Sequence, residues 1–461
     1  MHPAPTDEGQ PLVTVVVLNY NGAHLLPPCL DALAAQDLPA GQMAVWVVDN
    51  ASTDGSLDLL ARDYSWVTVI PNAQNDGFAG GNNIAMRTAT TPYVALTNND
   101  ARPTRDWLRN LLAPFQQDIS GRLAASTAKI VFLPRFLVLQ FETPAFLPGG
   151  LDTRELGVRI YQVTVNGRNV TDQVLWDRLA YGPEQAGPDR FRWSRPSGTL
   201  LVPVDPDRVA AEQKPLRIGL RVAAETEKPI ELSWREASAI VKASPDLAEV
   251  EITVPARAEL VDVVNNAGSI VFADGYGADR AYQELDRGQY DRPEEVFAFC
   301  GGAVCFRIEA LRDVGLFDED FFMYYEDTDL SWRLRARGWS IRYQPQAVTR
   351  HIHSASSVEW SPFFTFHVDR NRLLLLTKNA SAGLAVREVL RYPLTTASLA
   401  LRAVAYARHT RRRPPLRPTL LRLRVCASYL RLLPSLLRRR WTLARQAQLS
   451  RRELQRWLVP R

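Results

Sequence analysis

Two adjacent acids, Glu326 and Asp327, follow a run of aromatic residues in the stretch FFMYYEDTDLSWRLRARGW. Aromatic side chains that exclude water from a carboxylate raise its pKa and its basicity, which suits a general base. The alternative is structural, because acids at the start of a helix and arginines near its end both stabilise the helix. Gly338 also suits the position just after the end of such a helix. Asp329 fits the structural alternative, since it can pair with Arg333 one turn later. Asp327 fits proton removal better.

A second acid, Asp100, ends the apolar stretch YVALTNND. A carboxylate at a strand end can hold a hard cation, and Mg²⁺ typically uses one or two carboxylates together with substrate phosphates. A solvated turn before Pro103 is an equally good interpretation. Further along, His351 and His353 alternate in RHIHSASS after a strand-like segment, so at most one of them readily faces the same site. That histidine could bind the same cation, or it could be structural.

Two further stretches could hold a nucleotide. Asp49, in VVDNASTDGS, could accept a hydrogen bond from a base or a ribose hydroxyl, or it could belong to a turn that caps the next helix. The stretch NDGFAGGNN, residues 75–83, has glycines that let a backbone approach a ligand and a helix N-terminus that favours anions. It lacks the GxGxxG spacing of a dinucleotide site, and a flexible loop with a helix cap is its alternative.

A sheet must bring these residues together. Apolar, β-branched runs occur at residues 12–19, 44–50, 66–72 and 93–100, with helical segments at 25–35, 56–64 and 80–88 between them. This alternation predicts a parallel sheet covered by helices, whose ligands bind at the carboxyl ends of the strands. All four runs end in Asn or Asp, so we expect a single polar rim there.

The rest of the chain divides by its patterns. Short strands separated by turns, such as the one at Asn166-Gly167, dominate from about residue 134 to 261 and predict an antiparallel β insert. We assign residues 1–133 to the nucleotide-binding half of an α/β domain, 134–261 to a β-sandwich-like insert, 262–375 to the acceptor-binding and catalytic half, and 376–461 to a basic helical tail. The insert could bind the acceptor, mediate a homo-oligomer or act as a spacer.

The net charge of +5 is concentrated in that tail, which has no acid between Glu388 and Glu453. Basic, amphipathic helices bind anionic membrane surfaces. A nucleic-acid patch and a solvated face are the alternatives, and we favour the membrane and expect no nucleic-acid partner. The four cysteines are scattered, which does not suggest a disulfide framework. The N-terminal residues do not resemble a signal peptide, and every apolar stretch is shorter than a membrane span. We therefore expect a cytoplasmic protein, peripheral on the inner face of the membrane.

Taken in order, seven stretches resemble a family 2 glycosyltransferase of the GT-A fold, the group that includes bacterial rhamnosyltransferase-like enzymes. They are VTVVVLNYNG, VVDNASTDGS, NDGFAGGNN, TNND, FCGGAVCFRIEALRDVGLFDEDFF, YYEDTDLSWRLRARGW and HIHSASS, and they cover roughly residues 12–132 and 262–375. The resemblance implies an α/β, Rossmann-like nucleotide-sugar-binding domain, with the β insert outside the family's core. It also implies a metal-dependent, inverting enzyme with a dTDP- or UDP-sugar donor, Mg²⁺ or Mn²⁺, and a glycan or lipid-linked acceptor in cell-envelope polysaccharide synthesis.

The resemblance further implies residue roles. Asp327 would be the general base with Glu326 beside it, and Asp100 and His351 would bind the metal. The residues implied to hold the donor are Asn19, Asn21, Asp49, Asn50, Asn75, Gly77, Gly80, Asn82, Asn98 and Asn99. Residues 98–100 occupy the position of the family's DxD motif with a single acid. That departure supports an alternative, a non-catalytic glycan- or nucleotide-binding protein that retains the fold.

Overall fold

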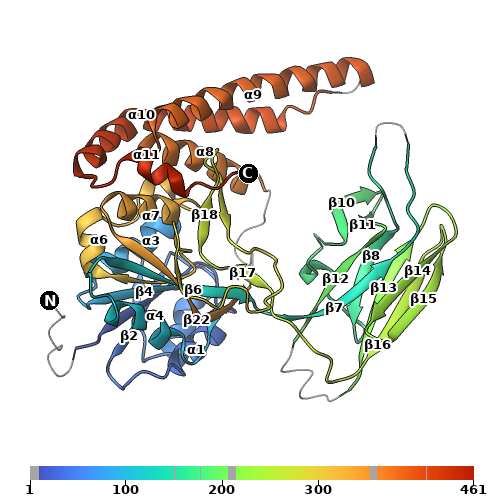
Figure 1. Ribbon diagram of the computed structural model, residues 1–461, viewed down its shortest axis with the longest axis horizontal. Coiled ribbons are helices and arrows are strands. Elements are labelled where there is room, and N and C mark those ends of the chain that lie inside the picture. Colours follow the sequence, from blue (N-terminus) through green and yellow to red (C-terminus); the bar gives the residue numbers. More distant parts are fainter. Residues whose placement is uncertain (1–9, 150–151, 177, 206–213, 353–360, 412) are drawn as a thin grey trace. The chain divides into compact units, whose positions relative to one another are not determined.

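A mixed sheet of ten strands carries the predicted site residues (Figure 1). Its main order is β20-β22-β6-β21-β4-β1-β2-β3, with β17 paired to β6 and β5 paired to β22. The strands are β1 (Val13–Asn19), β2 (Met43–Asp49), β3 (Thr68–Pro71), β4 (Tyr93–Asn98), β5 (Ala101–Pro103), β6 (Leu123–Phe132), β17 (Val264–Asn266), β20 (Glu294–Glu295), β21 (Ala303–Arg307) and β22 (Ser340–His351). The β1, β2, β3 and β4 strands are parallel, so their carboxyl ends coincide, as the sequence predicts.

Helices cover both faces of this sheet. They are α1 (Leu26–Ala34), α2 (Ser56–Asp63), α3 (Gly77–Thr88), α4 (Trp107–Gln116), α6 (Ile308–Val314) and α7 (Glu326–Ala336). In β1, Val15 and Val17 pack in a cluster with α1 and α4, whereas Val16 packs in a cluster with α3, α6 and α7. Because successive residues of a strand point to opposite faces, the continuous apolar run of β1 is buried on both sides.

The ends of two helices show how local sequence sets their bounds. After α7, Gly338 has a φ of +77°, its N–H donates to Arg335 O at 2.9 Å and the N–H of Trp339 donates to Leu334 O at 3.0 Å. This is the glycine-ended helix expected from the sequence. The start of α2 differs from expectation, because Gly55 holds the cap position with no side-chain hydrogen bond.

The structure describes residues 10–149, 152–176, 178–205, 214–352, 361–411 and 413–461, and it divides into two units. Unit 1 is Met1–Leu133, Val264–Tyr282 and Arg287–Arg461, and unit 2 is Pro134–Val263 and Gln283–Asp286. Unit 1 also contains a hairpin of β18 (Ser269–Val271) and β19 (Gly277–Asp279), and the short helix η2 (Glu319–Phe321).

Unit 2 consists of two antiparallel sheets that share one apolar cluster. Its elements are β7 (Arg135–Glu142), β8 (Arg159–Val165), β9 (Arg168–Asn169), η1 (Thr171–Gln173), β10 (Ala180–Ala186), β11 (Asp189–Ser194), β12 (Ser197–Val204), β13 (Leu216–Ala223), β14 (Lys228–Trp234), β15 (Ala237–Ala243) and β16 (Ala248–Val254). Asn166 and Gly167 both have positive φ between β8 and β9, as a two-residue hairpin turn requires. Trp176 and Trp193 are buried, which argues against exposed sugar-stacking platforms.

The C-terminal part of unit 1 is helical. It contains α8 (Pro362–Asn379), α9 (Ala382–Thr410), α10 (Arg417–Gln446), α11 (Arg451–Leu454) and η3 (Gln455–Trp457). Figure 1 shows α9 and α10 running side by side. Among the described residues, no helix has both the length and the apolar character needed to cross a bilayer. The predicted fold class, an α/β domain with an antiparallel β insert and a helical basic tail, is confirmed.

Candidate functional site

The carboxyl ends of β1, β2 and β4 carry one hydrogen-bonded polar network. Asn19 donates from Nδ2 to Asp49 Oδ2 at 3.0 Å and accepts at Oδ1 from Asn99 Nδ2 at 2.8 Å. Asp49 Oδ1 accepts the N–H of Ser52 at 2.9 Å. Asn19 and Asp49 are buried. The structure therefore brings three of the residues predicted to hold the donor into direct contact, with Asp49 already accepting two internal hydrogen bonds.

The loop after β1 joins this network through Ser52, a residue that the sequence analysis did not single out. Asn21 donates its N–H to Ser52 Oγ at 2.9 Å, and its Oδ1 accepts the N–H of Thr53 at 2.8 Å. Asn21 is exposed and has a φ of +50°. The sequence after Asp49 predicts a turn or a helix cap, but it does not predict the contact of Ser52 with Asn21.

Asn50 connects the same edge of the sheet to the start of α3. Its Nδ2 donates to Asn75 Oδ1 at 2.8 Å and to Gly77 O at 3.1 Å. Gly77 has a φ of +70°, and a Cβ there would lie 2.4 Å from Phe322 O, so only glycine fits. At Gly80, a Cβ would lie 2.6 Å from the Cβ of Asp76.

Asn82 lies apart from the network just described. It is buried, and its Nδ2 donates to Phe78 O, one turn earlier in the same helix, at 2.9 Å. This hydrogen bond lies within α3, unlike those of Asn50 and Asn75.

Asp100 and His351 meet because β5 pairs with β22, which places Ala101 opposite His351. Nε2 of His351 lies 3.1 Å from Asp100 Oδ1 and 3.3 Å from Asn98 Nδ2. Asp100 Oδ1 and His351 Nδ1 are buried and make no hydrogen bond with the described residues. His353 and the rest of the HIHSASS stretch after Ile352 lie outside the described residues.

These two side chains fit a hard divalent cation. An unsatisfied, buried carboxylate oxygen beside an imidazole nitrogen is a suitable pair of ligands. Within the described ranges, no group of three His, Cys, Asp or Glu side chains converges as a metal site. The protein would therefore supply two ligands from Asp100 and His351, and further positions would fall to water or to phosphate oxygens of a ligand.

Asp327 lies in the first turn of α7, partly exposed. Its Oδ1 accepts from the N–H of Thr328 at 2.6 Å and from Thr328 Oγ1 at 3.1 Å, and its Oδ2 accepts from the N–H of Gly301 at 3.4 Å. Burial raises the pKa of Asp327 to about 6, against the opposing effect of these hydrogen bonds. A carboxylate of this pKa is ionised at neutral pH and is a stronger base than an exposed one.

Glu326 has a different environment from its neighbour. It is 6% exposed, and its Oε2 has no hydrogen-bond partner in the described part of the chain. Burial, together with the charge of Asp327, raises the pKa of Glu326 well above its ordinary value. Both adjacent carboxyl groups thus have raised pKa values, and perturbed pKa values of this kind cluster at functional sites.

Other residues around Asp327 gave no usable sequence signal. The charge of Asp279, at the end of β19, contributes to the raised pKa of Asp327. Burial and the charges of Asp279 and Asp327 raise the pKa of the Cys300 thiol. The ring of Phe78 lies against Gly301, where a Cβ would approach it to 3.0 Å. These contacts join residues more than twenty positions apart, so no local pattern predicts them.

Asp329 is structural, as the sequence suggests. It is fully buried, and its Oδ2 accepts from Arg333 Nε at 2.8 Å and from Lys378 Nζ at 2.9 Å. Its Oδ1 accepts from Asn379 Nδ2 at 2.8 Å. All four hydrogen-bonding groups lie on α7 or α8, so this acid joins the two helices.

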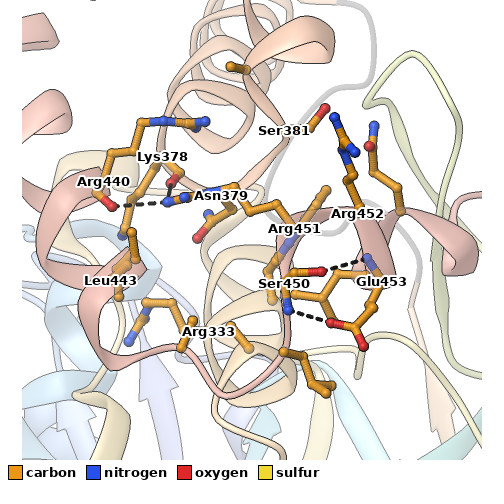
Figure 2. Close-up of a pocket in the computed structure, with 18 of the residues that line it drawn as sticks. Arg333, Lys378, Asn379, Ser381, Arg440, Leu443, Ser450, Arg451, Arg452 and Glu453 are labelled. Carbon is orange, nitrogen blue, oxygen red and sulfur yellow. Dashed lines mark hydrogen bonds between the residues drawn. The ribbon is translucent and has the colours of Figure 1, made fainter.

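A cavity of about 850 Å³ lies elsewhere in unit 1, among α7, α8, α10 and α11, and no predicted site residue lines it (Figure 2). Its arginines satisfy carbonyl groups at the end of α8. Arg440 Nη1 donates to Thr377 O and Ala380 O at 2.7 and 2.8 Å. Figure 2 shows Arg451 bridging the carbonyl oxygens of Lys378 and Arg440. These hydrogen bonds satisfy backbone carbonyl groups, as is usual at a helix C-terminus. We therefore place the candidate site at the edge of the sheet, where the predicted residues meet.

Two segments of the chain match models of protein families. Residues 14–130 match the family model "Glycosyl transferase family 2", and residues 259–366 match "Glycosyl transferase family group 2". The chain belongs to glycosyltransferase family 2. The first match contains the network around Asn19 and Asp49 and also Asp100, and the second contains Asp327 and His351. The segment between the two matches falls almost wholly in unit 2.

Curated members of the family are similar over short segments. The chain is 34% identical over 92 residues to the poly(ribitol-phosphate) beta-glucosyltransferase of Bacillus spizizenii, which is 19% of this chain and 14% of that protein. It is 35% identical over 133 residues to the N-acetylglucosaminyl-diphospho-decaprenol L-rhamnosyltransferase of Mycobacterium tuberculosis, 29% of this chain and 42% of that protein. The chain thus spans less than half of the length of either relative.

A search of solved structures finds similarity to GalNAc-T7 with UDP, GalNAc and Mn²⁺. The TM-score is 0.44 and the identity 11%, over 81% of this chain and 48% of that one. Another similar structure is the mannosyltransferase PcManGT from Pyrobaculum calidifontis with GDP-Man and Mn²⁺, at a TM-score of 0.38 and 16% identity over 96% of this chain and 78% of that one.

Proposed function

We propose that this family 2 member is an inverting, metal-dependent glycosyltransferase that moves a sugar from a dTDP- or UDP-sugar to a glycan or lipid-linked acceptor in cell-envelope polysaccharide synthesis. The observation that carries the proposal is Asp327, a partly exposed carboxylate with a pKa of about 6 at the start of α7. Two relatives whose names state transfer to poly(ribitol-phosphate) and to a decaprenol-linked sugar support the class of acceptor.

In the proposed reaction, Asp327 accepts the proton of the acceptor hydroxyl as that oxygen bonds to the anomeric carbon of the donor sugar. The bond from the anomeric carbon to the diphosphate breaks, and its electron pair leaves with the nucleoside diphosphate. One displacement inverts the anomeric carbon, so a second carboxylate is not needed as a nucleophile. Burial and the hydrogen bonds from Thr328 and Gly301 would hold Asp327 ready to receive the proton.

Donor binding is proposed at the edge formed by the strand ends. Asp49, Asn21 and Asn50 would contact the nucleotide. The N-terminus of α3, at Gly77, would lie near the diphosphate, because a helix N-terminus favours anions. Asp100 and His351 would hold Mg²⁺ or Mn²⁺. When bound, the cation would offset the negative charge that develops on the departing diphosphate.

The helical tail supports a second part of the proposal, contact with an anionic membrane surface. Exposed apolar side chains recur along both long helices, mostly at spacings of three, four and seven residues. They are Val386, Leu390, Leu394, Leu401 and Val404 on α9, and Leu420, Leu423, Leu430, Leu437 and Trp441 on α10. The sequence around them is rich in arginine and has no acid from residue 389 to 452. Such helices bind anionic lipid surfaces, where lipid-linked acceptors would be within reach.

The proposal is tested by nucleotide release from UDP-, dTDP- and GDP-sugars with Mg²⁺ or Mn²⁺, offered with a decaprenyl-diphosphate-linked acceptor. We expect turnover of one donor by the wild-type chain, none with EDTA, and a loss of at least about 100-fold in Asp327→Asn. Glu309→Gln, which changes an exposed carboxylate on α6, serves as the matched control and should keep wild-type turnover.

The outcomes separate the candidate functions. Metal-dependent nucleotide binding without turnover on any acceptor would favour the non-catalytic binding protein. Absence of nucleotide binding would remove the donor site from the strand ends and overturn the proposal.

A further inference from the structure

The four residues before Glu326, residues 322–325, have an unusual backbone. Phe322, Tyr324 and Tyr325 have φ values of +63°, +68° and +70°, and none of them is glycine. Positive φ is unfavourable at bulky residues and persists only where the surroundings enforce it. Glu326 and Asp327 follow directly, so the conformation of this loop, residues 322–325, sets where the two acids lie.

One side chain of α8 holds most of the loop. Asn371 is fully buried, and its Nδ2 lies 2.9, 2.8 and 2.7 Å from the carbonyl oxygens of Phe321, Met323 and Tyr324. A primary amide nitrogen has two hydrogens, so three acceptors use its donor capacity fully.

Arg370 reinforces the same contact from the next position of α8. Its Nη2 donates to Asp320 O at 2.8 Å and to Phe321 O at 3.0 Å, and its Nε donates to Asn371 Oδ1 at 2.9 Å. The ring of His367, one turn earlier, stacks on Phe322 with 5.4 Å between centroids. Burial lowers the pKa of His367 to about 4, so the ring is neutral beside the arginine at neutral pH.

The opposite side of the loop contacts the proposed donor site. Phe322 O accepts the N–H of Ala79, in the first turn of α3, at 3.1 Å. Gly77 packs so closely on Phe322 that a Cβ would lie 2.4 Å from the same oxygen. Phe322 thus joins the start of α3 to the loop before α7, and Asn371 holds the carbonyl groups of the residues on either side of Phe322.

We propose that Asn371, supported by Arg370, is a positioning residue that holds the loop 322–325 and thereby fixes Asp327 relative to the donor-binding edge at α3. The proposal rests on the proposed function and deepens it. Asn371 acts through the loop backbone and would not touch the substrate. Its loss would let the loop relax toward ordinary φ values and would move the base while the network around Asn19 and Asp49 stays intact.

The test compares two buried asparagines of the same helix. Asn371→Ala removes the loop contacts, whereas Asn379→Ala removes a hydrogen bond to Asp329 on a different surface of α8. For each variant we would measure kcat, both KM values, the pH dependence of kcat/KM, the Kd of the nucleoside diphosphate with Mn²⁺, and amide hydrogen exchange in residues 321–328. Thermal unfolding of both variants controls for general loss of stability.

We expect Asn371→Ala to lower kcat by at least about 30-fold and to move the acid limb of the pH profile. Amide exchange in residues 321–328 should become about tenfold faster, and the nucleotide Kd should stay within about threefold of wild type. Asn379→Ala should lower the melting temperature yet keep kcat within about threefold and leave exchange in the loop unchanged. Asn371→Asp, which keeps the size and removes the donor, should behave like Asn371→Ala.

Wild-type kcat, pH profile and exchange in Asn371→Ala would overturn the positioning role, as would equal kcat losses in Asn371→Ala and Asn379→Ala. Failure of the proposed function gives a different result, because the wild-type chain would then turn over none of the donors. In that case faster exchange in Asn371→Ala would still establish the contact with the loop, but its role in catalysis would be refuted.

Discussion

Asp327 and Asp329 lie two residues apart on α7, yet their carboxylates bond to different kinds of partner. Asp329 accepts hydrogen bonds from the cations Arg333 and Lys378, whereas Asp327 accepts from Thr328 and from the N–H of Gly301. The two cations tie Asp329 to α7 and α8, whereas burial raises the pKa of Asp327 to about 6. The short stretch EDTD therefore separates a structural acid from one that can take up a proton near neutral pH.

The pH dependence of kcat/KM should report the ionisation of Asp327. Its pKa is raised to about 6, so the basic form is the minority below that pH and dominates above it. We expect kcat/KM to rise with pH through an apparent pKa near 6 and then to level off. Steady-state assays from pH 5 to 9 would check this. A profile that is flat across pH 5–7, in an assay limited by chemistry, would contradict the assignment.

Asp329→Ala should destabilise the fold without changing the proposed base. The variant leaves Lys378 and Arg333 buried with fewer partners, and breaking a buried ion pair typically costs about 3–5 kcal/mol. Urea unfolding followed by circular dichroism measures the change. Asp63→Ala breaks an exposed pair with Arg62 and should leave the urea midpoint nearly unchanged. Equal shifts of the urea midpoint in the two variants would show that the hydrogen bonds of Asp329 contribute no more to stability than an exposed ion pair.

Gly77→Ala should weaken both the fold and the donor site. Gly41 also has a positive φ, at +81°, but a Cβ there meets nothing within 4 Å, whereas at Gly77 it would lie 2.4 Å from Phe322 O. The left-handed backbone lowers the stability of both alanine variants by roughly 1 kcal/mol, and only Gly77→Ala also displaces Phe322. We expect at least a tenfold larger loss of kcat/KM in Gly77→Ala than in Gly41→Ala, measured on the same donor.

Asp100→Asn should raise the metal concentration that supports half-maximal activity. The change keeps the side-chain shape and removes the single acid of the TNND strand end, so a hard cation loses its charged ligand. We expect at least a tenfold increase in the Mn²⁺ requirement, measured by titration into the chelator-treated chain. Asp58→Asn, an exposed position on α2, is the control. An unchanged Mn²⁺ titration in Asp100→Asn would remove this carboxylate from the metal site.

The tail should bind vesicles that contain phosphatidylglycerol and should not bind neutral phosphatidylcholine vesicles. Leu423→Asp with Leu430→Asp places acids on the exposed face of α10, where it should lower co-sedimentation at least tenfold. The same two substitutions to Ala keep the charge and should reduce binding less. Equal co-sedimentation with neutral vesicles would point to apolar adsorption, and binding to DNA in preference to vesicles would support the nucleic-acid alternative.

Local sequence was enough to predict the parallel strands, the helices between them and the antiparallel β insert, because each has its own apolar period or turn signal. Helix α7 was expected to end before Gly338, and it does. The contact of Asp100 with His351 depends on the pairing of β5 with β22, strands of three and twelve residues. The apolar pattern of the sequence does not predict this pairing. The contacts of Asn371 with the carbonyl groups of Phe321, Met323 and Tyr324 escaped prediction, because they span about fifty residues and every residue has a carbonyl group.

The two ends of the β insert leave and re-enter the sheet at paired positions, since Val264 of β17 lies opposite Val131 of β6. The chain between them could therefore change in length or be exchanged for another folded module while the register of the sheet stayed the same. An evolutionary history follows from this arrangement: unit 2 has the connectivity of a module acquired by a finished enzyme fold. Its sequence would then diverge under selection of its own, independently of the strand ends that surround Asp49 and Asp100.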